Sequence, residues 1–124
     1  MNVPLKRMVT LTDALGPLQL KVMRSLWRLN AATVAQVHTD LSSDSSQPYA
    51  YTTVLTVLRN LHRRGAISRT RLGKRDQYVV VLQESEYQRE IVRILRREIF
   101  SDDLAALANA IAREDEKQTT DDLK

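Results

Sequence analysis

Apolar side chains recur every three to four residues in the first half of the chain, which predicts amphipathic helices. The first helix begins at Pro17, because proline suits the first position of a helix, and it ends near Asn30. A second helix follows Thr33, whose hydroxyl suits an N-cap, and ends at Leu41. The polar segment 42–48 is typical of a linker, but the flanking helices are too short to bury a core alone. We therefore interpret it as a long turn within one domain.

The next helical stretch, residues 50–64, has one apolar and one polar face. Val54, Leu58 and Leu61 point to the same side and predict the buried face. Gly65 follows, and glycine readily adopts the left-handed conformation that ends many helices. Steps of about 100° per residue place four polar residues on the opposite face: Thr52, Thr56, Arg59 and Arg63. This second face suits an anionic groove.

Two short β-strands follow, at residues 67–71 and 77–82, separated by a glycine-containing loop at 72–76. The second strand is apolar on both faces from Tyr78 to Leu82, so we expect a helix to cover one side of it. A helix, a glycine stop and a hairpin in this order are typical of a winged helix-turn-helix, in which the helix reads DNA and the hairpin is the wing.

Helical spacing returns in two stretches, residues 84–100 and a run after Ser101, which is placed to cap it. Short amphipathic helices are marginal alone, and these lie far along the chain from the first core. A second copy of the protein is therefore the expected partner. The homodimer contact is expected to involve six apolar residues: Ile91, Leu95, Ile99, Leu104, Leu107 and Ile111.

Together these elements predict a mainly α protein with a small β-hairpin, built as a winged helix-turn-helix head with C-terminal dimerisation helices. At 124 residues, the chain suits one small domain and an appendage. The expected regions are an N-terminal arm at 1–14, the head at 15–83, a helical dimerisation region at 84–114 and a polar, frayed tail at 115–124.

Charge is distributed unevenly along the chain. The formal net charge is +4, but residues 1–101 contain 16 lysines and arginines against 8 acidic residues, whereas residues 102–124 contain 3 against 7. Seven cations follow one another with no acid among them: Arg59, Arg63, Arg64, Arg69, Arg71, Lys74 and Arg75. RNA or an anionic membrane surface would also attract this segment, but neither explains the helix in front of it. Double-stranded DNA is therefore the expected partner.

Several classes of function are disfavoured by what the sequence lacks. With no cysteine it has no disulfide, thiolate metal site or cysteine nucleophile, and its three glycines form no phosphate-binding loop. His38 and His62 lie apart from each other and from any carboxylate cluster with metal-ligand spacing, so we expect no metal and no cofactor. No nucleophile, base and orienting group come together, which argues against an enzyme. Apolar runs are too short to span a bilayer, so we expect a cytoplasmic protein without membrane insertion.

Four residues of the 50–64 helix are candidates for contact with DNA bases. Thr52 and Thr56 face outward, where a hydroxyl donates or accepts a hydrogen bond and a methyl contacts thymine. The Thr53 hydroxyl either reaches the DNA or bonds to its own helix backbone. Leu55 either meets a thymine methyl or packs on the preceding helix.

Other side chains are expected to hold the phosphate backbone. On or beside the helix these are Tyr49, Arg59, Asn60 and Arg63. The hairpin adds four more, which either grip the backbone or enter the minor groove: Arg69, Arg71, Lys74 and Arg75. Trp27 and Tyr51 lie on the apolar sides of their helices and are expected in the core.

Several segments resemble a known family in their order and spacing. They are Leu15-Gly16-Pro17-Leu18, Val22-Met23, Leu26-Trp27, Thr33-Val34 with Val37, and above all Ala50-Tyr51-Thr52-Thr53-Val54-Leu55-Thr56-Val57-Leu58, followed by Leu61, Arg64-Gly65 and Ile67. Over about residues 15–114 the chain is similar to the bacterial winged-helix regulators that include the BlaI and MecI penicillinase repressors and the copper repressors.

This resemblance implies a homodimer, joined through C-terminal helices, that binds an inverted-repeat operator and represses nearby genes. In relatives tied to β-lactam resistance, a membrane sensor protease triggers cleavage of the repressor, and the cleaved Asn-Phe pair corresponds here to Ala110-Ile111. An upstream sensor or protease is accordingly a possible partner of unknown identity. Copper-responsive relatives bind metal through clustered cysteines, which this chain lacks.

Two other interpretations are compatible with the sequence. A winged-helix interaction module would use the basic surface to dock an acidic protein partner, with no DNA readout. A regulator with a small-molecule pocket between head and dimer helices is the third possibility, although no buried polar cluster in the sequence favours one.

Overall fold

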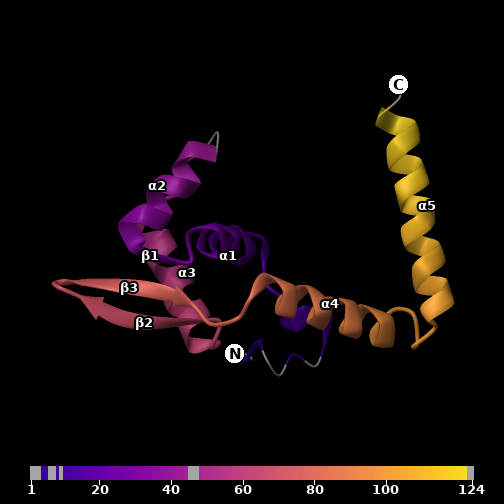
Figure 1. Ribbon diagram of the computed structural model, residues 1–124, viewed down its shortest axis with the longest axis horizontal. Helices are drawn as coiled ribbons and strands as arrows, with labels where there is room; N and C mark the ends of the chain where they lie inside the picture. The colour runs from indigo at the N-terminus through magenta and orange to yellow at the C-terminus, as the bar shows by residue number, and fades with distance from the viewer. Residues whose placement is uncertain (1–3, 6–7, 9, 45–47, 123–124) are drawn as a thin grey trace.

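The computed structural model describes residues 4–5, 8, 10–44 and 48–122. Over these residues the chain is mainly helical with a small antiparallel sheet, as the sequence predicted (Figure 1). In chain order the elements are η2 (Leu11–Asp13), α1 (Pro17–Leu29), β1 (Ala31–Thr33), α2 (Val34–Asp44), α3 (Tyr51–Arg63), β2 (Ile67–Leu72), β3 (Arg75–Val80), α4 (Glu84–Glu98) and α5 (Leu104–Asp122).

The first helix begins and ends where local signals place it. Pro17 occupies the first turn of α1, and Gln19 Oε1 accepts a hydrogen bond of 3.0 Å from the backbone N–H of Gly16, the N-cap. Asn30 ends the helix with a φ of 72°, the left-handed conformation that asparagine tolerates better than most residues. Met23 and Leu26 are fully buried on the inner face.

The second helix is longer than predicted. The expected cap is present, because the Thr33 hydroxyl accepts from Gln36 N at 3.3 Å and Gln36 Oε1 accepts from Thr33 N at 2.9 Å. The helix continues past Leu41 to Asp44, so the polar segment begins with a further helical turn. Its serines are accommodated because the Ser42 hydroxyl donates to the carbonyl of His38, four residues earlier, at 2.8 Å.

A short strand, β1, was not predicted. It pairs antiparallel with β3, with Ala32 opposite Tyr78, and the sheet order is β1-β3-β2. The strand β3 therefore lies in the centre of the sheet, and Tyr78 is 1% exposed. Val79 and Val80 are half-buried and Val81 is exposed, so only part of this apolar strand lies in the core.

The hairpin has a tighter turn than the expected 72–76 loop. Leu72 pairs with Arg75, which leaves Gly73 and Lys74 as a two-residue turn. Gly73 adopts a φ of +63°, as the first central residue of such turns often must. The strands therefore extend to the tip, and the wing projects from the head on the side opposite α4 (Figure 1).

The C-terminal helices depart from the prediction in two ways. The first stretch ends at Glu98, and Ser101 and Asp102 both have positive φ in the turn that follows. Asp103, rather than Ser101, caps α5, because its Oδ1 accepts from Ala106 N at 3.0 Å. The helix α5 then continues to Asp122, through residues expected to fray.

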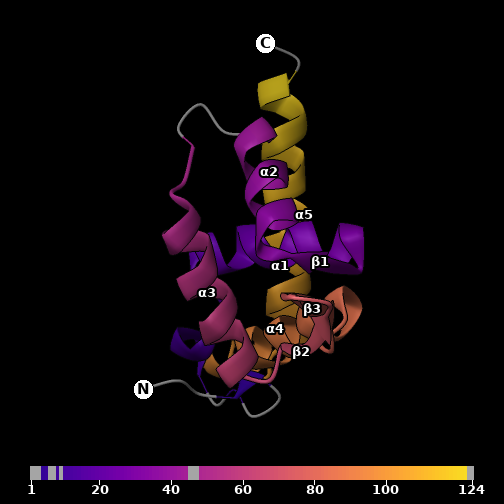
Figure 2. The ribbon, with the colours of Figure 1, turned by 90° about the vertical axis from the view of Figure 1, so that its left-hand side faces the viewer.

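The core lies between α1, α2, α3 and the sheet, and it continues under α4. Tyr87 and Ile94 of α4 are buried with Leu5 and Met8 of the N-terminal arm. The expectation that α4 needs a second copy to cover its apolar face is therefore wrong for this side of the helix. The arm lies beneath α4, and α5 rises from the far end of α4, away from the head (Figures 1 and 2).

Candidate nucleic-acid interface

The helix α3 separates its apolar and polar faces as the sequence predicted. Val54, Leu58 and Leu61 are fully buried in the core. On the other side Thr52, Thr56, Arg59 and Arg63 are all exposed. The helix begins after Ala50 and ends before Gly65, which adopts a φ of +76°. One complete face of α3 is thus available to a partner (Figure 2).

The threonines of this face differ in how their hydroxyls are used. Thr56 Oγ1 donates to the carbonyl oxygen of Thr52, one turn earlier, at 2.9 Å. A hydroxyl bond to the helix backbone was one of the two alternatives for Thr53, and Thr56 is the threonine that forms a bond of this type. Because Thr56 is exposed, its methyl and the lone pairs of its hydroxyl still face outward. Thr53 is exposed as well.

Two predicted contact residues are turned partly inward. Leu55 is half-buried and packs against the core with its inner side. Asn60 is also half-buried, and its Oδ1 accepts a hydrogen bond from Gln19 Nε2 of α1. These residues mark the two edges of the exposed face, with the wing beyond Leu55 and α1 beyond Asn60.

The two tyrosines at the start of α3 exchange their expected roles. Tyr51, expected in the core, is 48% exposed, and its ring meets that of His38 edge-on at 5.8 Å between centroids. Tyr51 continues the apolar stripe of α3 one turn beyond the core, where its ring contacts His38 of α2. Tyr49, expected at the surface, is half-buried and packs against the core. Its hydroxyl accepts from Lys21 Nζ at 3.0 Å.

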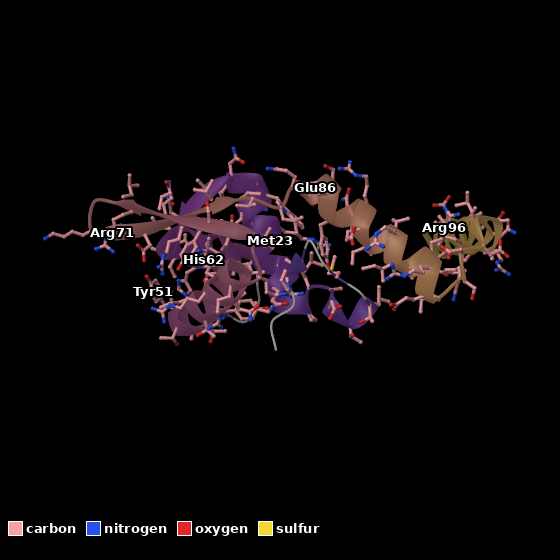
Figure 3. The ribbon with its side chains drawn as sticks, turned by 90° about the horizontal axis from the view of Figure 1, so that it is seen from below. Met23, Tyr51, His62, Arg71, Glu86 and Arg96 are labelled. Atoms are coloured by element: carbon pink, nitrogen blue, oxygen red, sulfur yellow. The ribbon has the colours of Figure 1, made fainter. Side chains whose placement is uncertain are left out.

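The wing carries the remaining predicted cations. Arg69, Arg71, Lys74 and Arg75 are exposed on β2, the turn and β3. Arg71 Nη1 lies 3.3 Å from Asp76 Oδ1, an exposed ion pair of small energetic value that offsets part of the charge of the wing. A groove between α3 and the wing is lined by Arg59 from the helix and by three of the wing cations. Figure 3 shows Arg71 out towards the end of the hairpin.

Arg64, counted among the seven cations of the basic segment, belongs to the interior. It follows Leu61 by three residues, so it continues the buried stripe of α3, and it is 6% exposed. Its guanidinium donates to the carbonyl of Asp13 and, at 3.2 Å, to Gln19 Oε1. Burial lowers the pKa of Arg64, and the neighbouring Tyr87 and Asp13 act in the opposite direction. The Arg64 charge therefore holds interior groups together and does not add to the basic surface.

Sequence reasoning missed a group of cations on α1. Lys21, Arg24 and Arg28 line a hollow together with Tyr49, beside the segment that leads into α3. Arg28 is ion-paired with Asp40 of α2, and Lys21 lies against the Tyr49 ring, 5.6 Å from its centroid. Their spacing along the outer face of α1 was a usable signal, because residues three, four and seven apart share one side of a helix.

The six apolar residues predicted for dimerisation do not share one environment. Ile91 packs partly against the core, Leu95 is half-buried, and Leu107 is 4% exposed. Large exposed apolar side chains remain on α4, the turn and α5, one of them unpredicted: Val92, Ile99, Leu104 and Ile111. A groove between the two helices is lined by Val92, Leu104 and Leu107 and bordered by arginines of α4.

The described part of the chain contains neither a metal-binding cluster nor a membrane-spanning helix. His, Cys, Asp and Glu side chains there form no group of three that could hold a metal ion. No helix of that part is both long enough and apolar enough to cross a membrane.

The order of α1, β1, α2 and α3, followed by a two-stranded wing, defines a winged helix-turn-helix protein. The sequence model of the penicillinase repressor family matches residues 15–124. The chain belongs to this family, which is one of DNA-binding transcriptional repressors and not of enzymes. Curated protein sequences give no significant match.

The solved structures that resemble the chain include two of the repressor BlaI. The first is the DNA-binding domain of the repressor BlaI, with a TM-score of 0.53 and 24% identity over 64% of this chain and 94% of that one. The second is monomeric BlaI of Bacillus licheniformis in complex with the blaP half-operator, with a TM-score of 0.50 and 26% identity over 59% of this chain and 87% of that one. These similarities confirm the winged-helix fold.

Proposed function

We propose that this repressor binds an inverted-repeat operator as a homodimer and places α3 of each head in successive major grooves on one side of the duplex. The observation that carries the proposal is the exposed face of α3, because Thr52, Thr56, Arg59 and Arg63 stand free of the core beside a basic wing. A helix of this kind fits the major groove, and a symmetric dimer requires a nearly symmetric site. The similarity to a monomeric repressor bound to its half-operator supports DNA binding by each head.

Base contacts are assigned to the first two turns of α3. Thr52, Thr53 and Thr56 offer hydroxyls and methyls to base edges, and the outer edge of Leu55 reaches a thymine methyl. Thr56 acts chiefly as an acceptor and through its methyl, since its proton is directed to the helix backbone. Short side chains such as threonine read sequence only when the helix backbone comes close to the bases, so the surrounding cations must fix the depth of α3 in the groove.

Backbone contacts are assigned to both flanks of α3. On one flank the groove formed by Arg59, Arg71, Lys74 and Arg75 is concave and positive, and Arg69 lies further along the wing. On the other flank Lys21 and Tyr49 form a hydrogen-bonded pair that can share a phosphate oxygen. Arg63 extends the cationic surface to the end of the helix, and Asn60 lies half-buried at the edge of the exposed face, where its amide can approach a phosphate.

The dimer contact is assigned to the outer side of α4 and to α5. Val92, Ile99, Leu104 and Ile111 are each more than half exposed, and a monomer rarely leaves such side chains uncovered together. The two helices also differ in charge, because arginines border the groove on α4 whereas Glu114, Asp115 and Glu116 follow on α5. A second chain that places its α5 against α4 of the first would cover the apolar groups and pair these charges.

Selection of bound sequences from a random duplex library tests the proposal most directly. We expect enriched sequences with two half-sites in inverted orientation, about one helical turn or a multiple of it apart. Enrichment of single half-sites alone would contradict the dimer. No retention of any duplex at low salt would contradict DNA binding and favour an acidic protein as the partner of the basic surface.

A further inference from the structure

The N-terminal arm bridges the recognition helix and the dimerisation helices. Its residues 4–14 lie outside the segment that matches the family model, which begins at residue 15. Leu5 and Met8 are nevertheless 1% and 3% exposed, as deeply buried as the core of the head. We propose that the arm is a strap that fixes α4 relative to α3, and that Leu5 and Met8 are positioning residues for the spacing of the two operator half-sites. This rests on the proposed dimeric function.

On the head side, the strap is tied to the end of α3. The backbone N–H of Leu5 donates to the carbonyl of Arg64 at 3.1 Å. The buried Arg64 guanidinium in turn donates to the carbonyl of Asp13, at the other end of the arm, and to Gln19 of α1. Arg64 directly follows the last helical residue of α3. Both ends of the arm therefore hold the residue that ends the recognition helix.

On the other side, the strap and Leu15, the residue that follows it, are bonded to α4 from its first turn to its last. The Tyr87 hydroxyl, in the first turn, accepts from Leu15 N at 2.9 Å. Arg93 Nη2 donates to the carbonyl of Met8 at 3.5 Å, and Glu98 Oε2, in the last turn, accepts from Leu11 N at 3.1 Å. Tyr87 and Glu98 lie on the face of α4 that buries Ile94, and Arg93 reaches the strap from the side of that face.

Without the strap, α4 would be held to the head mainly at its beginning. Leu82 is buried just before the helix, its carbonyl accepts from Trp27 Nε1 at 2.8 Å, and the Trp27 and Tyr87 rings lie 6.0 Å apart. These contacts restrain the first turn only. A 15-residue helix is about 22 Å long, so a swing of about 20° around its first turn moves its far end by about 8 Å.

This displacement matters because the far end of α4 leads into the proposed dimer contact. One base pair adds about 3.4 Å to the duplex, so a swing of this size corresponds to more than two base pairs of half-site separation. A fixed α4 makes the dimer select one spacing, whereas a loose α4 lets it accept several. The strap therefore controls the choice of paired sites without touching the DNA.

The first test measures the strap in the absence of DNA. The chain has no cysteine, so spin labels attach only where cysteines are introduced, at His62→Cys on α3 and Arg96→Cys on α4, both exposed and both labelled in Figure 3. Dilution with unlabelled protein isolates the distance within one chain. We expect a narrow distribution in the otherwise unchanged chain and one at least twice as wide after Leu5→Ala with Met8→Ala. Leu72→Ala, on the exposed wing, is the control that leaves the width unchanged.

A milder variant keeps the test decisive if the double substitution unfolds the protein. Glu98→Ala removes the acceptor of Leu11 N at the surface and leaves the core intact, and we expect it to widen the distribution by about half as much. Equal widths for Glu98→Ala and the parent chain would overturn the strap, as would equal widths for a folded double variant.

The second test uses duplexes that carry two half-sites at increasing separations. We expect the parent protein to prefer one separation by more than tenfold and the Glu98→Ala variant to lose most of that preference, with unchanged affinity for a single half-site. A retained preference would overturn the role in spacing. Failure of the parent to bind any paired site would instead contradict the dimeric function, while a widened spin-label distribution would still establish the strap.

Discussion

The salt dependence of DNA binding offers a quantitative test of the wing. Each phosphate contact contributes about −0.9 to the slope of log affinity against log salt concentration. The α3 face and the wing expose Arg59, Arg63, Arg69, Lys74 and Arg75 in each head, besides Arg71, which shares its charge with Asp76. If about four of these cations contact phosphate in each head, the dimer slope is about −7, and a doubling of salt weakens binding about a hundredfold.

Arg75→Ala should lower this slope by a predictable amount. Arg75 pairs with Leu72 at the tip of the wing and lines the groove beside α3, so its loss removes one contact in each head. The slope should become shallower, at about −5.4, and a doubling of salt should then weaken binding only about fortyfold. Affinity at low salt should decrease on operator and random duplexes alike, because a phosphate contact carries no sequence information.

Fluorescence anisotropy of a labelled duplex, titrated at several salt concentrations, measures both slopes. Arg113→Ala is the matched control, since it removes an exposed arginine outside the proposed DNA interface and on the side of α5 opposite Ile111, and it should leave the slope unchanged. An unchanged slope in Arg75→Ala would refute the assignment of the wing to the phosphate backbone. Loss of affinity for the operator only would show that Arg75 reads bases.

The remaining predictions address base readout, assembly and stability. Thr56→Ala should reduce discrimination between operator and random DNA by about 1–3 kcal/mol in competition binding, and an equal loss on both duplexes would contradict its reader role. Leu104→Asp should produce monomers in light scattering because Leu104 is 58% exposed at the proposed contact, whereas the neighbouring Ala105→Asp, as control, should remain dimeric. Burial raises the pKa of Tyr87, so the stability that its neutral form contributes is present below pH 10, its ordinary pKa, and is lost as pH rises further. Tyr87→Phe should therefore flatten the fall of thermal stability above that pH, and an unchanged fall would assign it to other groups.

The elements that sequence predicted best are those governed by local interactions. Pro17 begins α1, Thr33 caps α2 and Gly65 ends α3, and each acts through the backbone of its own turn. The exposed face of α3 follows from the same short-range periodicity. The strand β1 escaped prediction because a strand from Ala31 to Thr33 is too short to show a period, and it exists only through its pairing with β3.

Residues that meet distant parts of the chain were predicted less well. Arg64 and Asn60 both look like surface residues in sequence, yet Gln19 of α1 binds both side chains. Tyr49 and Tyr51 exchanged places because the path of the chain into α3, rather than the helical period, decides which ring meets α1. A polar residue on a helix margin is directed inward only when a distant partner satisfies it, and the spacing of one helix contains no information about that partner.

The helix α4 shows how contacts with distant parts of the chain changed the prediction of the dimer contact. Its apolar residues form two stripes, one with Tyr87, Ile91 and Ile94 and the other with Val92 and Ile99, about a third of a turn apart. Sequence periodicity indicated a single stripe, from which Ile91, Leu95 and Ile99 were assigned to a second chain. The arm covers the first stripe within the same chain, so only the second remains for a partner. A dimer built on this smaller surface must draw on α5 as well, which is why substitutions in α5 rather than at Ile91 should separate the subunits.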